Sequence, residues 1–237
     1  MTKFETKTWI DVKLRRECSL VSLILLIAGA GCSGSHCDVL MSASTTRPSS
    51  TTLAVAQAAP KRAVFIDTYE EATTIVYLCD ASATMLPAFG NLKAKLKDSV
   101  NALSLEGNQK FNVIFCSDGN IFPLFKDEAH MPTGDNKRLA MNFIDSAIPT
   151  GTDQPIPSIK FAMAEKPDLL YVLSDGFSGD STVDDAVREL RNDNIAGKTH
   201  VNCIFFQTDT DPKFAQTMKT IAADGHGVIK KVLVSDM

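Results

Sequence analysis

The chain has 237 residues, of which 44% are hydrophobic and 22% are charged. These are ordinary values for a globular protein with a hydrophobic core, and the length allows one large domain or two small ones. The net charge of −4 at pH 7 gives no reason to expect binding to nucleic acid. The notable basic cluster, Lys13, Arg15 and Arg16, belongs to the N-terminal pattern described next.

Residues 1–31 have the three-part form of a secretory signal peptide. The basic cluster is followed by an apolar run at 20–27 and by small residues, Ala-Gly-Ala, at 28–30. The apolar run is shorter than the roughly 20 residues that span a bilayer. We therefore expect export to the cell envelope or periplasm. Membrane attachment, through an uncleaved segment or through a lipidated Cys32 that resembles a bacterial lipoprotein site, is an open alternative to cleavage and release.

Residues 32–61 are rich in Ser, Thr, Ala and Pro and contain few side chains that could form a core. Such a composition is typical of a flexible tether. We expect it to connect the N-terminal segment to one domain that covers residues 62–237.

Three of the six cysteines, Cys79, Cys116 and Cys203, lie in apolar runs of that domain. Buried cysteine commonly packs as a small hydrophobic residue. These three cysteines are too far apart in the sequence for the paired spacing of a zinc site, and the four histidines form no cluster. We expect these three cysteines to be core residues.

The stretch from 75 to 85 is the most informative part of the domain. It begins with Ile-Val-Tyr-Leu-Cys, which predicts a strand buried on both faces of a sheet, and continues with Asp80, Ser82 and Thr84 at alternate positions. Open α/β sheets place their ligand sites in loops at the carboxyl ends of parallel strands. Carboxylate and hydroxyl oxygens are the ligands of hard divalent cations. This loop therefore predicts a metal site.

Strands and helices alternate along the rest of the domain. We expect residues 63–67 to pair with the central strand as a hairpin-like edge, and Asp118-Gly119 to turn an antiparallel hairpin whose second strand, with Pro123, lies at a sheet edge. Pro87 is expected in the first turn of a helix that Gly107 ends. In a second helix, from about Asp135, we expect these side chains to face the core: Leu139, Phe143, Ile144 and Ala147.

Further apolar runs and helical patterns continue this alternation to the end of the domain. Strands are predicted at 111–116, 169–174, 201–206 and 228–234, and helices at 157–163, 183–190 and 212–221. The order predicts an α/β fold: a doubly wound, mostly parallel central sheet with helices on both faces and one antiparallel edge strand.

Two more oxygen-bearing residues fall at or near predicted strand ends. Thr152 lies in a polar turn, and Asp175 directly follows a buried strand. Together with Asp80, Ser82 and Thr84, they resemble the metal-ion-dependent adhesion site of the von Willebrand factor A (vWA) domain family, which consists of an Asp-x-Ser-x-Ser loop, a distant Thr and a distant Asp. The resemblance covers residues 62–237. Thr84 stands where the family usually has Ser, and Ala83 and Thr150 stand where Gly is frequent.

The resemblance implies a binding module rather than an enzyme. It implies that Ser82 and Thr84, and in some members of the family the residue matching Thr152, ligate a cation such as Mg²⁺ directly, with Mn²⁺ or Ca²⁺ as alternatives. It also implies that Asp80 and Asp175 act directly or through water. One coordination position then remains for an acidic side chain of a protein partner.

Two other functions are consistent with the same residues. A metal-free vWA-like scaffold would keep the fold without the cation. A phosphoryl-transfer enzyme would use Asp80 as its nucleophile, but the phosphatase pattern has a second Asp at the position of Ser82, and the sequence has no Gly-rich phosphate loop. Each polar residue taken singly is also explained by helix capping or a turn. Their order and their positions at or near strand ends favour the metal site.

Overall fold

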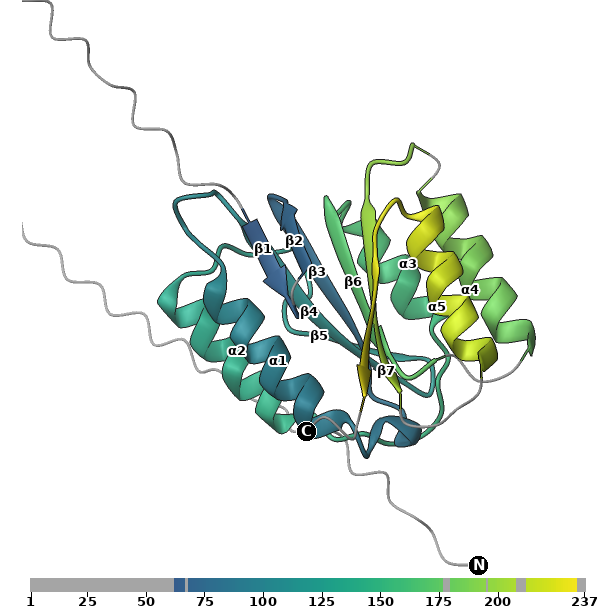
Figure 1. Ribbon diagram of the computed structural model, residues 1–237. Helices are drawn as coiled ribbons and strands as arrows, with labels where there is room; N and C mark the ends of the chain where they lie inside the picture. The colour runs from purple at the N-terminus through teal and green to yellow at the C-terminus, as the bar shows by residue number, and fades with distance from the viewer. Residues whose placement is uncertain (1–61, 67, 177–179, 195, 208–211, 234–237) are drawn as a thin grey trace, which may run out of the picture. The chain divides into compact units, whose positions relative to one another are not determined.

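The computed structural model describes residues 62–66, 68–176, 180–194, 196–207 and 212–233 (Figure 1). All of them belong to one compact unit. The predicted signal segment and tether, residues 1–61, lie outside the described residues. In the part of the chain that is described, no helix is both long enough and apolar enough to cross a membrane.

A six-stranded sheet in the order β5-β4-β3-β6-β7-β8 forms the centre of this unit (Figure 1). Neighbouring strands pair in parallel except for β5, which is antiparallel to β4 at one edge. The predicted fold class, a mostly parallel sheet with one antiparallel edge strand, is confirmed. The strands are β3 (Thr74–Asp80), β4 (Lys110–Ser117), β5 (Asn120–Pro123), β6 (Leu169–Ser174), β7 (His200–Gln207) and β8 (Ile229–Leu233).

Helices cover both faces of the sheet, which is why its central strands are continuous apolar runs. Along β3, Ile75 and Tyr77 pack into the core beneath α1 and α2, while Val76 and Leu78 pack into the core beneath the other three helices. The helices are α1 (Phe89–Ala102) and α2 (Gly134–Ser146) on one face, and α3 (Ile156–Ala164), α4 (Asp180–Asp193) and α5 (Pro212–Asp224) on the other (Figure 1).

A two-stranded hairpin precedes the sheet and does not join it in the described residues. Its strands, β1 (Arg62–Phe65) and β2 (Thr68–Glu71), pair with each other. The prediction that residues 63–67 pair with the central strand was therefore wrong. The hairpin instead lies on the face of the sheet, because the buried ring of Phe65 packs against both Tyr77 and Tyr171 at centroid distances of 6.0 and 5.3 Å.

Two helix details also differ from the prediction. A short 3₁₀ turn, Ala83–Met85, follows the central strand, and α1 begins only at Phe89, so Pro87 precedes the helix instead of lying in its first turn. In α2, Leu139 does not face the core: 46% of its surface is exposed, and the neighbouring Ala140 is buried in its place. The small Ala140 side chain sits one turn before the buried Ile144, as expected for residues on one helix face.

Candidate metal site at the carboxyl end of the sheet

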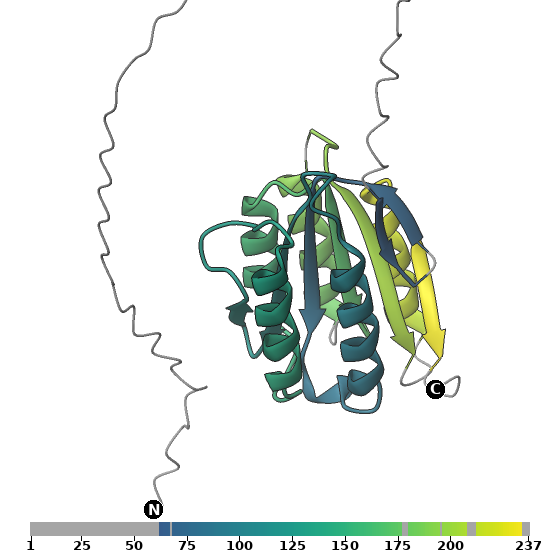
Figure 2. The ribbon, with the colours of Figure 1, turned by 90° about the vertical axis from the view of Figure 1, so that its left-hand side faces the viewer.

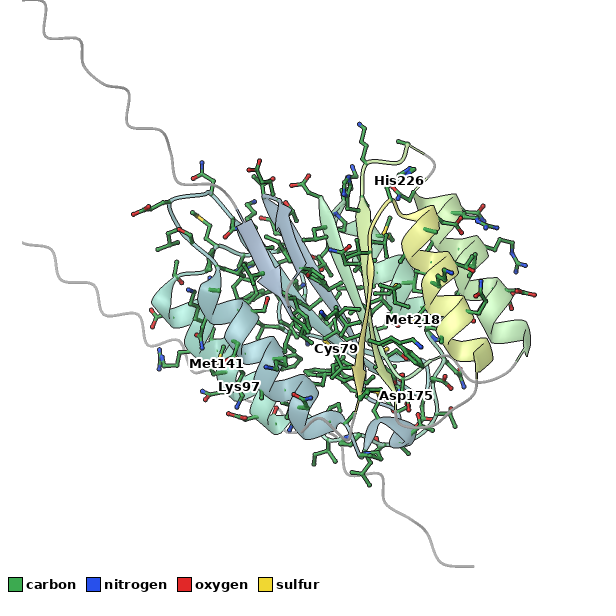
Figure 3. All side chains as sticks on the ribbon, in the orientation of Figure 1. Cys79, Lys97, Met141, Asp175, Met218 and His226 are labelled. Carbon is green, nitrogen blue, oxygen red and sulfur yellow. The ribbon has the colours of Figure 1, made fainter. Side chains whose placement is uncertain are left out.

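The predicted site lies where the connections of β3 and β6 diverge. The two strands are adjacent and parallel, but the chain leaves β3 towards α1 on one face and leaves β6 towards α4 on the other (Figure 1). Asp80 ends β3, and Asp175 directly follows β6. In Figure 3, Asp175 lies at this carboxyl end of the sheet and His226 at the opposite end. The position is a topological switch point, the usual ligand-binding position in open α/β sheets.

Asp80 is buried, with 2% of its surface exposed, and both of its carboxylate oxygens accept hydrogen bonds. Oδ1 accepts the backbone N–H of Ser82 at 2.8 Å, and Oδ2 accepts the hydroxyl of Ser174 at 2.7 Å. Burial raises the pKa of Asp80 to about 7, the bonds from Ser174 and Ser82 oppose this rise, and the nearby charge of Asp175 adds to it. A second carboxylate therefore lies close to Asp80.

Ser82, Thr84 and Asp175 form a chain of hydrogen bonds beside Asp80. The hydroxyl oxygens of Ser82 and Thr84 are 2.9 Å apart, and the Thr84 hydroxyl donates to Asp175 Oδ1 at 3.2 Å. Ser82 and Asp175 are buried, whereas Thr84 is exposed. The structure thus links four of the five predicted site residues through direct hydrogen bonds.

The loop that carries Thr152 is held against the loop that follows β3. Two backbone bonds join them: the N–H of Thr150 donates to the carbonyl of Ala81 at 2.8 Å, and the N–H of Ala83 donates to the carbonyl of Gly151 at 3.0 Å. The fifth predicted residue, Thr152, therefore lies in a loop that adjoins the other four, and it is exposed.

The Thr152 side chain forms a hydrogen bond with Asp118, for which the sequence predicts only a place in a turn. Its hydroxyl donates to Asp118 Oδ1 at 3.1 Å. The predicted hairpin at Asp118-Gly119 is confirmed by the antiparallel pairing of β4 and β5, but Asp118 also belongs to the site region. One feature of the sequence could have indicated this second contact: Asp118 directly follows a buried parallel strand, as Asp175 does after β6.

The donor set fits a small hard cation. In the part of the chain that is described, no three His, Cys, Asp or Glu side chains are grouped to hold a metal, so a cation here would depend on hydroxyl oxygens as well as carboxylates. Neighbouring ligands of an octahedral Mg²⁺, each at about 2.1 Å, lie about 3 Å apart. The oxygen separations of 2.9 Å between Ser82 and Thr84 and 3.2 Å between Thr84 and Asp175 match that spacing.

The three cysteines that the structure describes are not among the oxygen donors of this site. Cys79, Cys116 and Cys203 are buried, as predicted, and each is a free cysteine. Burial raises the pKa of the Cys116 thiol to about 12, which keeps it neutral and unreactive at neutral pH.

No protein-family model and no curated protein sequence matches the chain. Solved structures do match it. One is a von Willebrand factor type A protein from Catenulispora acidiphila, with a TM-score of 0.55 and 14% identity over 70% of this chain and 40% of that protein. Another is the vWF domain of the type V pili tip protein Mfa5 from Porphyromonas gingivalis, with a TM-score of 0.54 and 9% identity over 69% of this chain and 90% of that domain.

A third match is proximal thread matrix protein 1 from the mussel byssus, whose structure has a zinc-occupied MIDAS motif. Its TM-score is 0.50, with 19% identity over 69% of this chain and 42% of that protein. This chain therefore spans only about two fifths of the first two proteins in the comparison. At these identities the similarity concerns the fold alone. The described part of the chain has the fold of a vWA domain.

Proposed function

We propose that this protein is a binding module that recognises a protein partner through a divalent cation held at the carboxyl end of its sheet. The observation that carries the proposal is the hydrogen-bonded group of Asp80, Ser82, Thr84 and Asp175 at the switch point. Its spacing suits a hard cation, and all of its potential ligand atoms are oxygens. The zinc-occupied motif of the mussel protein supports the choice of a divalent ion.

Each residue has a distinct part in this proposal. The hydroxyls of Ser82 and Thr84 would ligate the cation directly. Asp80 holds the loop in its turn through the N–H of Ser82. Asp175 accepts the hydrogen of Thr84, so the Thr84 oxygen, which also accepts from Ser82, retains a second lone pair for the cation. When bound, Mg²⁺, or Mn²⁺ or Ca²⁺ in its place, supplies positive charge and an open position for a carboxylate of the partner.

Two exposed apolar side chains beside the site support a protein as the partner. Leu86 is 67% exposed and Ile148 is 59% exposed, the highest values among the large hydrophobic residues that the structure describes. They lie in the connections that carry Thr84 and Thr152. Helices α1 and α2 run side by side (Figure 2), and Lys93 of α1 donates a hydrogen bond to the carbonyl of Asp145 of α2 at 3.0 Å. The N-terminal end of α1, which Leu86 precedes, therefore meets the C-terminal end of α2, which Ile148 follows.

The enzyme alternative is disfavoured by the surroundings of Asp80. A carboxylate nucleophile must expose an oxygen to its substrate. Asp80 is 2% exposed, and both of its oxygens accept hydrogen bonds, one from Ser82 and one from Ser174.

We further propose that the protein is exported to the cell envelope, on the basis of the three-part pattern of residues 1–31.

Calorimetric titration of the full chain with Mg²⁺ and Mn²⁺ tests the proposal. Thr84→Val removes one proposed ligand from an exposed position and should weaken binding by about tenfold or more. Thr220→Val, whose hydroxyl bonds within α5, is the matched control and should bind as the wild type does. If the wild type binds neither ion, the proposed metal site does not exist.

The partner is tested with envelope extract passed over immobilised wild type and Thr84→Val, with and without EDTA. A partner of the proposed kind is retained by the wild type with Mg²⁺ and is lost both with EDTA and with Thr84→Val. Retention that is indifferent to EDTA and to the variant would favour the metal-free scaffold.

A further inference from the structure

Asp118 joins the β4–β5 turn to the loop that carries Thr152, although the two residues are 34 positions apart. Its Oδ1 accepts the backbone N–H of Thr152 at 2.7 Å and the hydroxyl of Thr152 at 3.1 Å. Its own N–H donates to the carbonyl of Thr152 at 2.7 Å. One exposed turn residue thus holds both the backbone and the side chain of a predicted ligand.

Both loops have unusual backbone conformations at this contact. Asp118 has φ +51° and Gly119 has φ +72°, in the left-handed region that Asp and Gly tolerate best. Gly151 has φ +67°, and a Cβ atom on it would lie 1.9 Å from Asp118 Oδ2. The carboxylate of Asp118 therefore occupies space that only glycine at position 151 leaves free. The two loops are shaped to fit each other.

The hydrogen bond has a chemical consequence for Thr152. A hydroxyl ligates a cation through a lone pair of its oxygen, so its hydrogen must point elsewhere. Thr152 donates its hydrogen to Asp118, just as Thr84 donates to Asp175. A carboxylate that accepts a ligand's hydrogen fixes the orientation of that ligand and makes it a better electron donor.

We propose that Asp118 is a positioning residue of the cation site, which sets the loop of Thr152 and directs the Thr152 oxygen towards the cation. This inference rests on the proposed function and assigns a part in it to the β4–β5 turn. Asp118 is exposed, so its charge is screened by solvent. It therefore acts through its hydrogen bonds and not through its charge.

Two substitutions of Asp118 in the full chain separate these effects, with Mn²⁺ alone as the probe. Asp118→Ala removes the acceptor and should weaken Mn²⁺ binding by about tenfold or more, with faster hydrogen exchange at the Thr152 amide. Asp118→Asn keeps an acceptor oxygen without the charge and should stay within about threefold of the wild type. Glu106→Ala, an exposed residue in the α1–β4 connection, removes the same charge at the other end of the sheet and should change neither measurement.

Thr152→Val is a second variant that does not depend on how Asp118→Ala folds. It removes only the exposed hydroxyl and should lose Mn²⁺ affinity by the same factor as Asp118→Ala. Wild-type affinity in either variant would overturn the inference, and so would an equal loss in Asp118→Asn and Asp118→Ala. If the wild type binds Mn²⁺ while these variants behave otherwise than expected, only this inference fails. If the wild type itself does not bind, the proposed function fails with it.

Discussion

At the scale of single residues, the polar groups at the end of the sheet share one arrangement. Thr84 and Thr152 each donate a hydrogen to a carboxylate, and the two carboxylates come from different loops. The sequence predicted Thr84, Thr152 and Asp175 because a known pattern contains them. It did not predict the contact between Asp118 and Thr152, because local turn chemistry explains an Asp-Gly pair fully and a contact across 34 residues leaves no local pattern.

Gly151 tests this arrangement through stability. Gly151→Ala should lower the free energy of unfolding by about 1–3 kcal/mol, because φ +67° strains a residue with a side chain and the new Cβ meets the Asp118 carboxylate. Gly90→Ala in α1 is the control, since nothing lies within 4 Å of a Cβ there. It should raise stability by up to about 1 kcal/mol. Urea denaturation measures both, and an unchanged midpoint for Gly151→Ala would contradict the observed contact.

Glu165 carries a prediction of pH dependence. Its Oε1 accepts a bond from Asn112 at 2.7 Å, while its Oε2 is buried with no partner among the described residues. Burial raises the pKa of Glu165, although the Asn112 bond opposes the rise. Because the folded-state pKa is the higher one, the folded protein prefers the protonated form. Stability is therefore lost as the pH rises from the unfolded pKa to the raised folded pKa, and the loss remains above it.

Glu165→Gln should remove that loss. The free energy of unfolding of the variant, relative to that of the wild type, should be higher at pH 7.5 than at pH 4. At pH 4 the wild-type carboxyl is itself largely protonated, so the two proteins differ less. Urea denaturation of both proteins at the two pH values measures this difference. A stability difference that does not depend on pH would show that the buried carboxylate carries no penalty.

At the scale of elements, the sequence predicted which segments form strands and helices better than it predicted which strands pair with each other. The runs that became β3 and β6 were recognised because burial on both faces produces continuous apolar stretches. The partner of the first strand was missed, because an apolar run specifies burial and not the strand with which it pairs. For α2, the helical period allows Leu139 or Ala140 to face inward, and the structure buries the smaller residue.

The hairpin is expected to contribute strongly to stability despite lying outside the main sheet. Phe65 is 1% exposed and packs on two tyrosines of the sheet, so Phe65→Ala should lower the free energy of unfolding by about 3–5 kcal/mol. Leu139→Ala, at the exposed position in α2, should cost less than about 0.5 kcal/mol. A larger cost at Leu139 than at Phe65, measured by urea denaturation, would reverse the observed assignment of core and surface.

At the scale of the whole described unit, the proposed site and the exposed residues Leu86 and Ile148 belong to the connections at the carboxyl end of the sheet. Leu86 adjoins the loop of Thr84, and Ile148 follows α2 before the loop of Thr152. Isolated exposed apolar residues are common on protein surfaces. Here the two most exposed ones in the described residues lie in the connections that carry Thr84 and Thr152, an arrangement that suits a partner with apolar side chains beside its carboxylate.

The double variant Leu86→Ser, Ile148→Ser separates partner contact from cation binding. Neither side chain ligates or supports a proposed ligand, so Mg²⁺ affinity and stability should stay at wild-type values. Retention of the chelator-sensitive partner should fall by about tenfold, because losing apolar contact area costs about 25 cal/mol per Å² of surface that is no longer buried. Leu105→Ser, on an exposed side chain in the α1–β4 connection at the opposite end of the sheet, is the matched control. Equal partner retention by the double variant and the wild type would place the partner's apolar contacts elsewhere.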